Sequence, residues 1–195
     1  MKEARLPPRK GVIHPLRHVE LLTYVREGAL AYEDCTGQAG IIRAGDFQRV
    51  TATAGVRYME TNSSLVNPVH IFQLRLRSAL GALEPSHERK RFSTAQRRGT
   101  LCVVASPDAR QGSLQLNHDV VVYSAILDSG QHIAHLLQNR RAGWLHVVEG
   151  EIGIKDTSLS SGDGAGISAE PAISFTSQKP TEVLLIDLST ADRSF

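Results

Sequence analysis

The sequence predicts an all-β protein that contains two similar β-barrels of the jelly-roll type, and three observations support this prediction. Short runs rich in β-branched and aromatic residues recur along the chain, helical periodicity is scarce, and two segments resemble each other. The 195 residues suffice for one large or two small domains, and 41% hydrophobic with 22% charged residues is an ordinary globular composition.

The expected strands are short apolar runs that lie between turn signals. In chain order they are Leu21–Val25, Phe47–Thr53, His70–Leu76, Leu101–Ala105, Val120–Leu127, Trp144–Val148 and Val183–Leu188. The run 69–77 alternates strictly, with His70, Phe72, Leu74 and Leu76 on one face and Gln73, Arg75 and Arg77 on the other. This alternation predicts a half-buried strand.

Two turn signals occur twice in the chain. Val-Arg-Glu-Gly28 precedes Asp34 by six residues, and Val-Val-Glu-Gly150 precedes Asp156 by the same six residues. A Gly-Asp pair follows in each copy, at 45–46 and at 162–163. Such internal similarity indicates a duplicated structural unit. We therefore expect a first domain at residues 1–80, a connecting segment at 81–99, and a second domain at 100–195.

The candidate site combines His14-Pro-Leu16 with Tyr58-Met-Glu60. On a strand, side chains two residues apart point the same way and lie roughly 7 Å apart. We therefore expect all four side chains to point into one cavity. We also expect Tyr58 to fill the place of a metal or to bond Glu60, since a buried carboxyl group needs a partner.

These four residues form an incomplete set of metal ligands. Leu16 has no lone pair, and Tyr58 ligates only as a phenolate, from an ordinary pKa of about 10. His14 and Glu60 alone fall short of the three protein ligands usual in a catalytic site. Glu20, expected on the same face as His14, is the one plausible substitute donor.

These segments resemble those of the pirin family, whose members are bicupins, with two cupin barrels in one chain. Pirins read H-P-H-[RK] and G-[IV]-x-H-S-E, and three histidines and one glutamate hold a single metal, usually iron. By this resemblance His14 and Glu60 stand at ligand positions, while Leu16 and Tyr58 stand where pirins carry histidine. Further similarity lies in Ala-Ser-Pro-Asp-Ala109, Gly112-Ser-Leu, and residues 140–150 and 183–188.

The resemblance also suggests that the first domain is shortened at its start. Pirins carry more residues ahead of the H-P-H segment than the 13 residues that precede His14 here. A strand edge left uncovered there would invite pairing with another chain.

Two functions follow from the resemblance. Pirins show a metal-dependent, quercetin 2,3-dioxygenase-like activity, and they also bind partner proteins, including transcription factors. Because two ligand histidines are replaced, we favour a non-catalytic binding or regulatory role, with no cofactor expected. The alternative is a quercetin 2,3-dioxygenase-like oxidoreductase with a divalent metal such as iron. A small aromatic ligand in the first barrel is compatible with either function.

In the second domain, His132, His135 and His146 lack a matching carboxylate, so no metal site is predicted there.

The remaining composition restricts partners and compartment. Residues 75–98 are basic, with Arg75, Arg77, Arg89, Lys90, Arg91, Arg97 and Arg98 against Glu84 and Glu88. This segment is either a solvated connection or a patch for an acidic partner protein. A formal charge of +2 does not favour nucleic acid, and no apolar run reaches the length of about 18 residues that a membrane span needs. The start lacks a signal-peptide core, and Cys35 and Cys102 make no disulfide framework, so the cytoplasm is expected.

Overall fold

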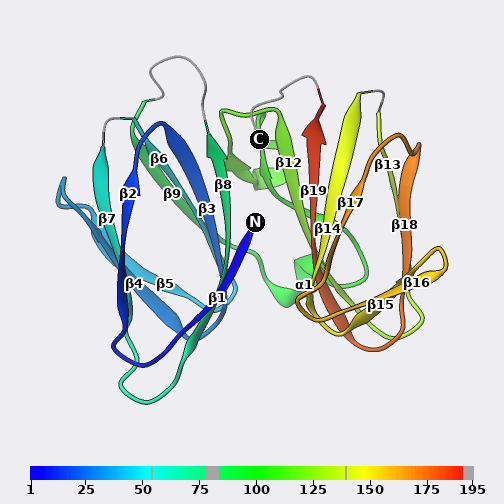
Figure 1. Ribbon diagram of the computed structural model, residues 1–195, viewed down its shortest axis with the longest axis horizontal. Helices are drawn as coiled ribbons and strands as arrows, with labels where there is room; N and C mark the ends of the chain where they lie inside the picture. Colours follow the sequence, from blue (N-terminus) through cyan, green and yellow to red (C-terminus); the bar gives the residue numbers. More distant parts are fainter. Residues whose placement is uncertain (54, 78–83, 139, 191–195) are drawn as a thin grey trace. The chain divides into compact units, whose positions relative to one another are not determined.

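Strands dominate both halves of the chain in the computed structural model, which describes residues 1–53, 55–77, 84–138 and 140–190 (Figure 1). The chain divides into two units between Phe92 and Ser93. Each unit contains a larger and a smaller sheet, so the predicted all-β architecture with two barrels is confirmed. Among the described residues, no helix is long and apolar enough to cross a membrane.

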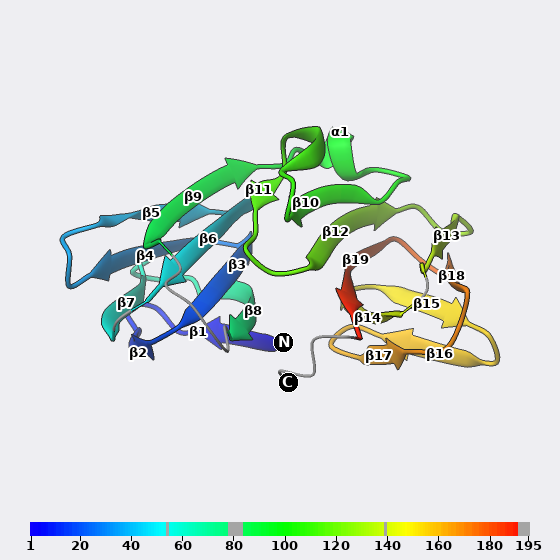
Figure 2. The same ribbon diagram turned by 90° about the horizontal axis from the view of Figure 1, so that it is seen from above.

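The first unit is built from two antiparallel sheets, of five and four strands (Figure 2). In spatial order, the five-stranded sheet holds β1 (Lys2–Leu6), β8 (Val69–Arg77), β3 (Val19–Glu27), β6 (Asp46–Ala52) and β9 (Ser86–Arg91). The four-stranded sheet holds β2 (Gly11–Leu16), β7 (Val56–Asn62), β4 (Ala29–Asp34) and β5 (Ala39–Arg43). Side chains from both sheets meet between the sheets, where Leu16 and Tyr58 pack with Leu21 and Val50, and a second cluster packs Leu30 against Ile71.

The second unit repeats this plan with sheets of six and four strands. The larger sheet holds, in spatial order, β11 (Leu114–Gln115), β10 (Cys102–Ser106), β12 (Val120–Leu127), β19 (Thr181–Ser189), β14 (Arg141–Glu149) and β17 (Gly164–Ile167). The smaller sheet holds β13 (His132–Leu136), β18 (Ala172–Ser177), β15 (Glu151–Ile154) and β16 (Thr157–Ser160). Two short helices complete the unit, α1 (Thr94–Arg97) and the 3-10 turn η1 (Arg110–Gly112). A capping box from Ser93 starts α1.

All seven predicted strands are present, but the expected connecting segment is not a bare linker. The expected boundary between residues 80 and 81 lies outside the described residues. Within the described part of 81–99, β9 pairs with β6 inside the first unit, and α1 belongs to the second unit. The polar composition of β9 hides it from a pattern search, because Ser-His-Glu-Arg-Lys-Arg has no apolar alternation.

The repeated glycine turns are sterically demanding positions. Gly150 has φ +97°, and a Cβ atom there would lie 2.4 Å from Thr181 Oγ1 and 2.5 Å from the carbonyl oxygen of Pro180. We expect Gly150→Ala to lower the free energy of unfolding by about 2–4 kcal/mol, because left-handed strain and overpacking add. Gly37→Ala is the matched control, since Gly37 has φ +87° and nothing within 4 Å of its Cβ position. Urea denaturation of both variants measures the difference, and equal losses would contradict the steric argument.

Candidate functional site

The four residues of the candidate site point into the first barrel, as the strand spacing predicts. In β2 and β7, His14 lies opposite Tyr58 in the register. Leu16, Tyr58 and Glu60 have no exposed surface, and His14 is only 6% exposed. Between these positions, Pro15 and Met59 face outward and are exposed.

Glu60 is hydrogen-bonded from two sides at the centre of this site. His14 Nε2 lies 2.8 Å from Glu60 Oε2. Gln73 Nε2 lies 2.9 Å from each carboxyl oxygen of Glu60 and also donates to Thr23 Oγ1 at 3.2 Å. The buried carboxyl group therefore obtains its partners from β2 and β8, as a buried polar group requires.

The partner of His14 Nδ1 fixes the tautomer of the ring. Arg75 Nη2 lies 2.8 Å from His14 Nδ1. A guanidinium group can only donate hydrogen bonds, so Nδ1 accepts and Nε2 carries the hydrogen that is donated to Glu60. Both ring nitrogens of His14 are thus engaged, Nδ1 as an acceptor and Nε2 as a donor.

Tyr58 does not bond Glu60, so that one of the two expected alternatives is wrong. Its hydroxyl group donates to Gln48 Oε1 at 3.2 Å. Its ring stacks against Tyr32, with ring centroids 5.9 Å apart. Burial raises the pKa of Tyr58 far above its ordinary value, and the nearby Glu60 carboxyl group adds to the shift. The phenol is therefore protonated at neutral pH and offers no phenolate ligand.

Glu20 does not share the face of His14, and the expectation of a substitute donor there is wrong. Glu20 neighbours Leu21, whose side chain faces the core of the barrel, so Glu20 projects from the opposite face of β3. Thr51 Oγ1 donates to Glu20 Oε1 on that face. Alternation counted from His14 does not give the face of Glu20, because a turn with His18 at φ +48° separates β2 from β3. Strand parity holds only within one strand.

Sequence reasoning missed Gln73, Arg75 and Gln48. Gln73 and Arg75 were assigned to the polar face of β8, which is the face that reaches His14 and Glu60. Residues 69–73 are buried on both faces, so apolar alternation could not identify the inner one. The signal that identifies Gln73 is the buried pair of His14 and Glu60. A buried carboxyl group needs hydrogen-bond donors, and Gln73 lies on a strand of the same barrel.

The second unit does not gather its histidines into one site. His132 bonds Thr176 on the exposed side of β13, and His135 bonds Asp187. Throughout the described parts of the chain, no three or more His, Cys, Asp or Glu side chains lie close enough together to hold a metal ion. Both cysteines are free, and burial raises the pKa of the Cys102 thiol.

Comparisons with known proteins agree with the fold and with the site segments. The Pirin family model matches residues 4–76, and the model for the quercetinase C-terminal cupin domain matches residues 103–188. A quercetin 2,3-dioxygenase of Escherichia coli strain K12 is 35% identical over 175 residues, which are 90% of this chain and 74% of the relative. A pirin-like protein of Caulobacter vibrioides is 31% identical over 89% of this chain and 75% of its own length.

Solved structures lead to the same family. The crystal structure of the bacterial pirin YhhW from Escherichia coli in complex with nickel(II) has a TM-score of 0.88 to this chain and 32% sequence identity. That alignment covers 96% of this chain and 80% of the YhhW chain. Together with the relatives that align over nine-tenths of its length, this likeness shows that the chain belongs to the pirin family.

Proposed function

We propose that this pirin-family protein acts by binding and not by metal-dependent oxygen chemistry. The observation that carries the proposal is the state of His14, whose two ring nitrogens are engaged by Arg75 and Glu60. Beside it, Leu16 offers no lone pair and Tyr58 is held as a protonated phenol. The residues present do not fit a four-ligand iron site, because at most two of the four positions can ligate. No reaction step through a metal is therefore assigned.

In this proposal the polar residues organise the barrel and do not hold an ion. The hydrogen-bonded chain Arg75–His14–Glu60–Gln73 starts and ends on β8 and passes through β2 and β7. These strands belong to different sheets, so the chain of bonds ties the two sheets together. Satisfied networks of this kind stabilise one arrangement of a barrel interior.

The alternative is a metal-dependent quercetin 2,3-dioxygenase-like oxidoreductase, and one observation favours it. His14 and Glu60 have kept the convergence that the family site needs, at 2.8 Å from each other. Relatives carry the name quercetin 2,3-dioxygenase, and one related structure holds nickel(II). His14 could bind a metal only after it released its bond to Glu60 or its bond to Arg75.

The test is oxygen consumption with quercetin after incubation with Fe(II), and separately with Ni(II). The matched control is Glu60→Gln, which keeps the shape of the side chain and removes its negative charge. We expect the wild-type protein to consume no more oxygen than Glu60→Gln does. Turnover in the wild type that Glu60→Gln abolishes would overturn the proposal and establish the alternative.

An acidic partner protein for residues 75–98 remains part of the proposal. Several cations of this segment have partners within the chain: Arg89 bonds the carbonyl oxygen of Ile41, and Lys90, Arg91, Arg97 and Arg98 pair with Glu88, Asp46, Glu182 and Asp128. Three of these contacts place a carboxylate from elsewhere in the chain beside a cation of the segment, which weakens its local positive charge. Arg91, whose side chain is 67% exposed and lies 3.8 Å from Asp46, is a cation that a partner can reach.

We also propose a small aromatic ligand in the first barrel and a cytoplasmic location. A small aromatic ligand in the first barrel would have to displace Leu16 or Tyr58, because both are fully buried in the core. A cytoplasmic location is compatible with two free cysteines, since such compartments keep thiols reduced.

A further inference from the structure

The two units can be aligned strand by strand from their hydrogen-bond registers alone. Strands β3 and β14 are each nine residues long and run from 19 to 27 and from 141 to 149. Strands β8 and β19 are also nine residues long, from 69 to 77 and from 181 to 189. The β3–β8 pair has a bulge between Val25 and Glu27, and the β14–β19 pair has one between Val147 and Glu149. The alignment is therefore fixed without gaps on these strands.

This alignment shows that the polar site of the first barrel has a counterpart in the second. Asp187 of β19 occupies the position of Arg75 in β8. On the smaller sheets, the pair His135 and Ile173 occupies the position of the pair His14 and Tyr58.

The equivalent histidines also make equivalent contacts. His14 Nδ1 lies 2.8 Å from Arg75, and His135 Nε2 lies 2.8 Å from Asp187 Oδ2. The charge of the partner is reversed in the second barrel, and Glu60 is replaced there by the apolar Phe175.

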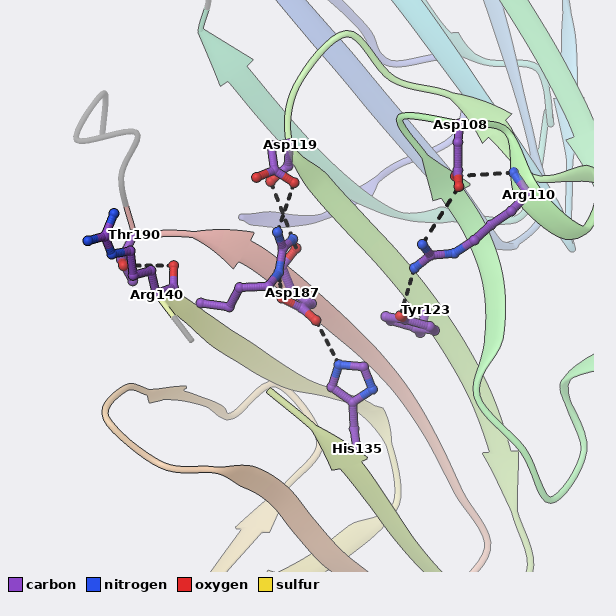
Figure 3. A network of polar contacts seen from close by, with 9 residues as sticks. Asp108, Arg110, Asp119, Tyr123, His135, Arg140, Asp187 and Thr190 are labelled. Carbon is purple, nitrogen blue, oxygen red and sulfur yellow. Dashed lines mark hydrogen bonds and ion pairs between the residues drawn. The ribbon is translucent and has the colours of Figure 1, made fainter. Parts of the chain in front are cut away.

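Asp187 is held as a carboxylate, which fixes the second histidine (Figure 3). Arg141 Nε donates to Asp187 Oδ1, and Arg141 Nη1 donates to Asp119 Oδ1 at 2.8 Å. Burial would raise the pKa of Asp187, but the hydrogen bonds from His135 and Arg141 outweigh burial and lower it. Because the carboxylate can only accept, His135 Nε2 carries the donated hydrogen. His135 Nδ1 is then the free nitrogen of the ring, with no hydrogen-bond partner among the described residues.

A phenol and a guanidinium lie beside this histidine. The Tyr123 ring centroid is 4.9 Å from that of His135. Arg110 Nη2 donates to the Tyr123 hydroxyl oxygen at 3.2 Å (Figure 3). The hydroxyl hydrogen of Tyr123 is thereby left to donate elsewhere. Arg110 also lies 3.8 Å from Asp108, but both side chains are largely exposed, so this ion pair is weak.

The loop that presents Arg110 is strained and tightly bonded. Ala109 and Gln111, on either side of Arg110, both have left-handed φ values, 51° and 54°. Such φ values are unfavourable for a residue with a side chain. Ser106, fully buried, bonds Ser113 at 2.8 Å and accepts from the backbone N–H of Arg110. Backbone strain that is maintained by surrounding hydrogen bonds is concentrated at functional sites.

We propose that Tyr123 and Arg110, beside His135, form a binding site for a small organic carboxylate in the second barrel. Tyr123 and Arg110 present donors, so the ligand must be an acceptor, and a guanidinium pairs best with a planar carboxylate. His135 Nδ1 carries only a lone pair in this tautomer and does not bond the carboxylate, but the His135 ring packs against Tyr123 and adjoins the site. Asp187 and Arg141 satisfy each other and act as positioning residues. This site is separate from the proposed function of the first barrel and does not depend on it.

The experiment follows the histidine ring signals by NMR during a titration of the whole protein with benzoate. We expect saturable shifts of the His135 ring signals, while those of His14 stay in place. Arg110→Gln should weaken benzoate binding by about tenfold or more, because a charge-assisted hydrogen bond is lost. Tyr123→Phe, which keeps the packing of the ring, should weaken it by roughly threefold to tenfold.

Arg98→Gln is the matched control, since it removes the same charge from the second unit and its side chain is 61% exposed beside Asp128. We expect this variant to bind benzoate within about twofold of the wild type. The proposal fails if His135 shows no saturable shift with benzoate. It also fails if Arg98→Gln weakens binding as much as Arg110→Gln, because the effect would then be one of overall charge.

Discussion

Replacing Leu16 and Tyr58 together by histidine should raise the bound iron from less than roughly a tenth of an equivalent to about one equivalent per chain. Both side chains already point into the barrel beside His14 and Glu60, so the new imidazoles join a preformed pair. Three histidines and one glutamate form a donor set that suits non-haem iron. The measurement is metal analysis of the purified variant after incubation with Fe(II) and gel filtration.

The matched control for this variant is Ile13→His with Met59→His. These two residues lie opposite each other on the same two strands but are exposed, so the control adds two histidines on the wrong face. Adding Arg75→Gln to the double variant should tighten iron binding further, because it frees His14 Nδ1. Equal iron in the inward and outward variants would contradict the assignment of the inner face.

Asp187→Ala should lower the free energy of unfolding by about 3–5 kcal/mol, the largest loss of stability that we expect from an ion-pair variant. The substitution leaves Arg141 and His135 without their buried acceptor. Asp119→Ala is the control, because Asp119 also bonds Arg141 but its side chain is 61% exposed. Asp119→Ala should lower the free energy of unfolding by at most about 1 kcal/mol. Urea denaturation at neutral pH compares the two variants.

The effect of Asp187→Ala should also depend on pH in a defined direction. The pKa of Asp187 is lowered in the folded protein, from about 3.9 in an unfolded chain. A lowered pKa contributes stability that is fully present above the unfolded value and is lost as the pH falls through the folded value. The stability difference between wild type and variant should therefore be constant from pH 7 to about pH 5 and shrink below about pH 4. A difference that grew on acidification would contradict the assigned shift.

The sequence predicted β3, β6, β8, β10, β12, β14 and β19, all of them in the two larger sheets, because their apolar runs and glycine turns are local signals. Among the strands that it did not predict are β1 and β9, which are edge strands of a sheet and consist largely of charged and polar residues. Their pairing with β8 and β6 depends on backbone hydrogen bonds between segments far apart in the chain. Such partners leave no periodic pattern in the edge strand itself.

The candidate site was predictable only where face assignment stayed within one strand. His14, Leu16, Tyr58 and Glu60 followed from a spacing of two residues, which β2 and β7 preserve. The same spacing gives the wrong face for Glu20, because a turn with His18 at φ +48° separates Glu20 from His14. Arg75 was placed on the polar face of β8, yet that face turns inward to His14. The polar face of a strand need not face water when the interior of the barrel holds a carboxyl group, because that group needs hydrogen-bond donors.

Iron content of the wild-type protein tests the central claim most directly. The protein is purified without chelators, incubated with excess Fe(II) under anaerobic conditions, passed through gel filtration, and analysed for metal per chain. We predict less than roughly a tenth of an equivalent, since only His14 and Glu60 can ligate and both ring nitrogens of His14 already have partners. About one equivalent of iron in the wild type, lost in Glu60→Gln, would contradict the account and restore the metal-dependent function to the first barrel.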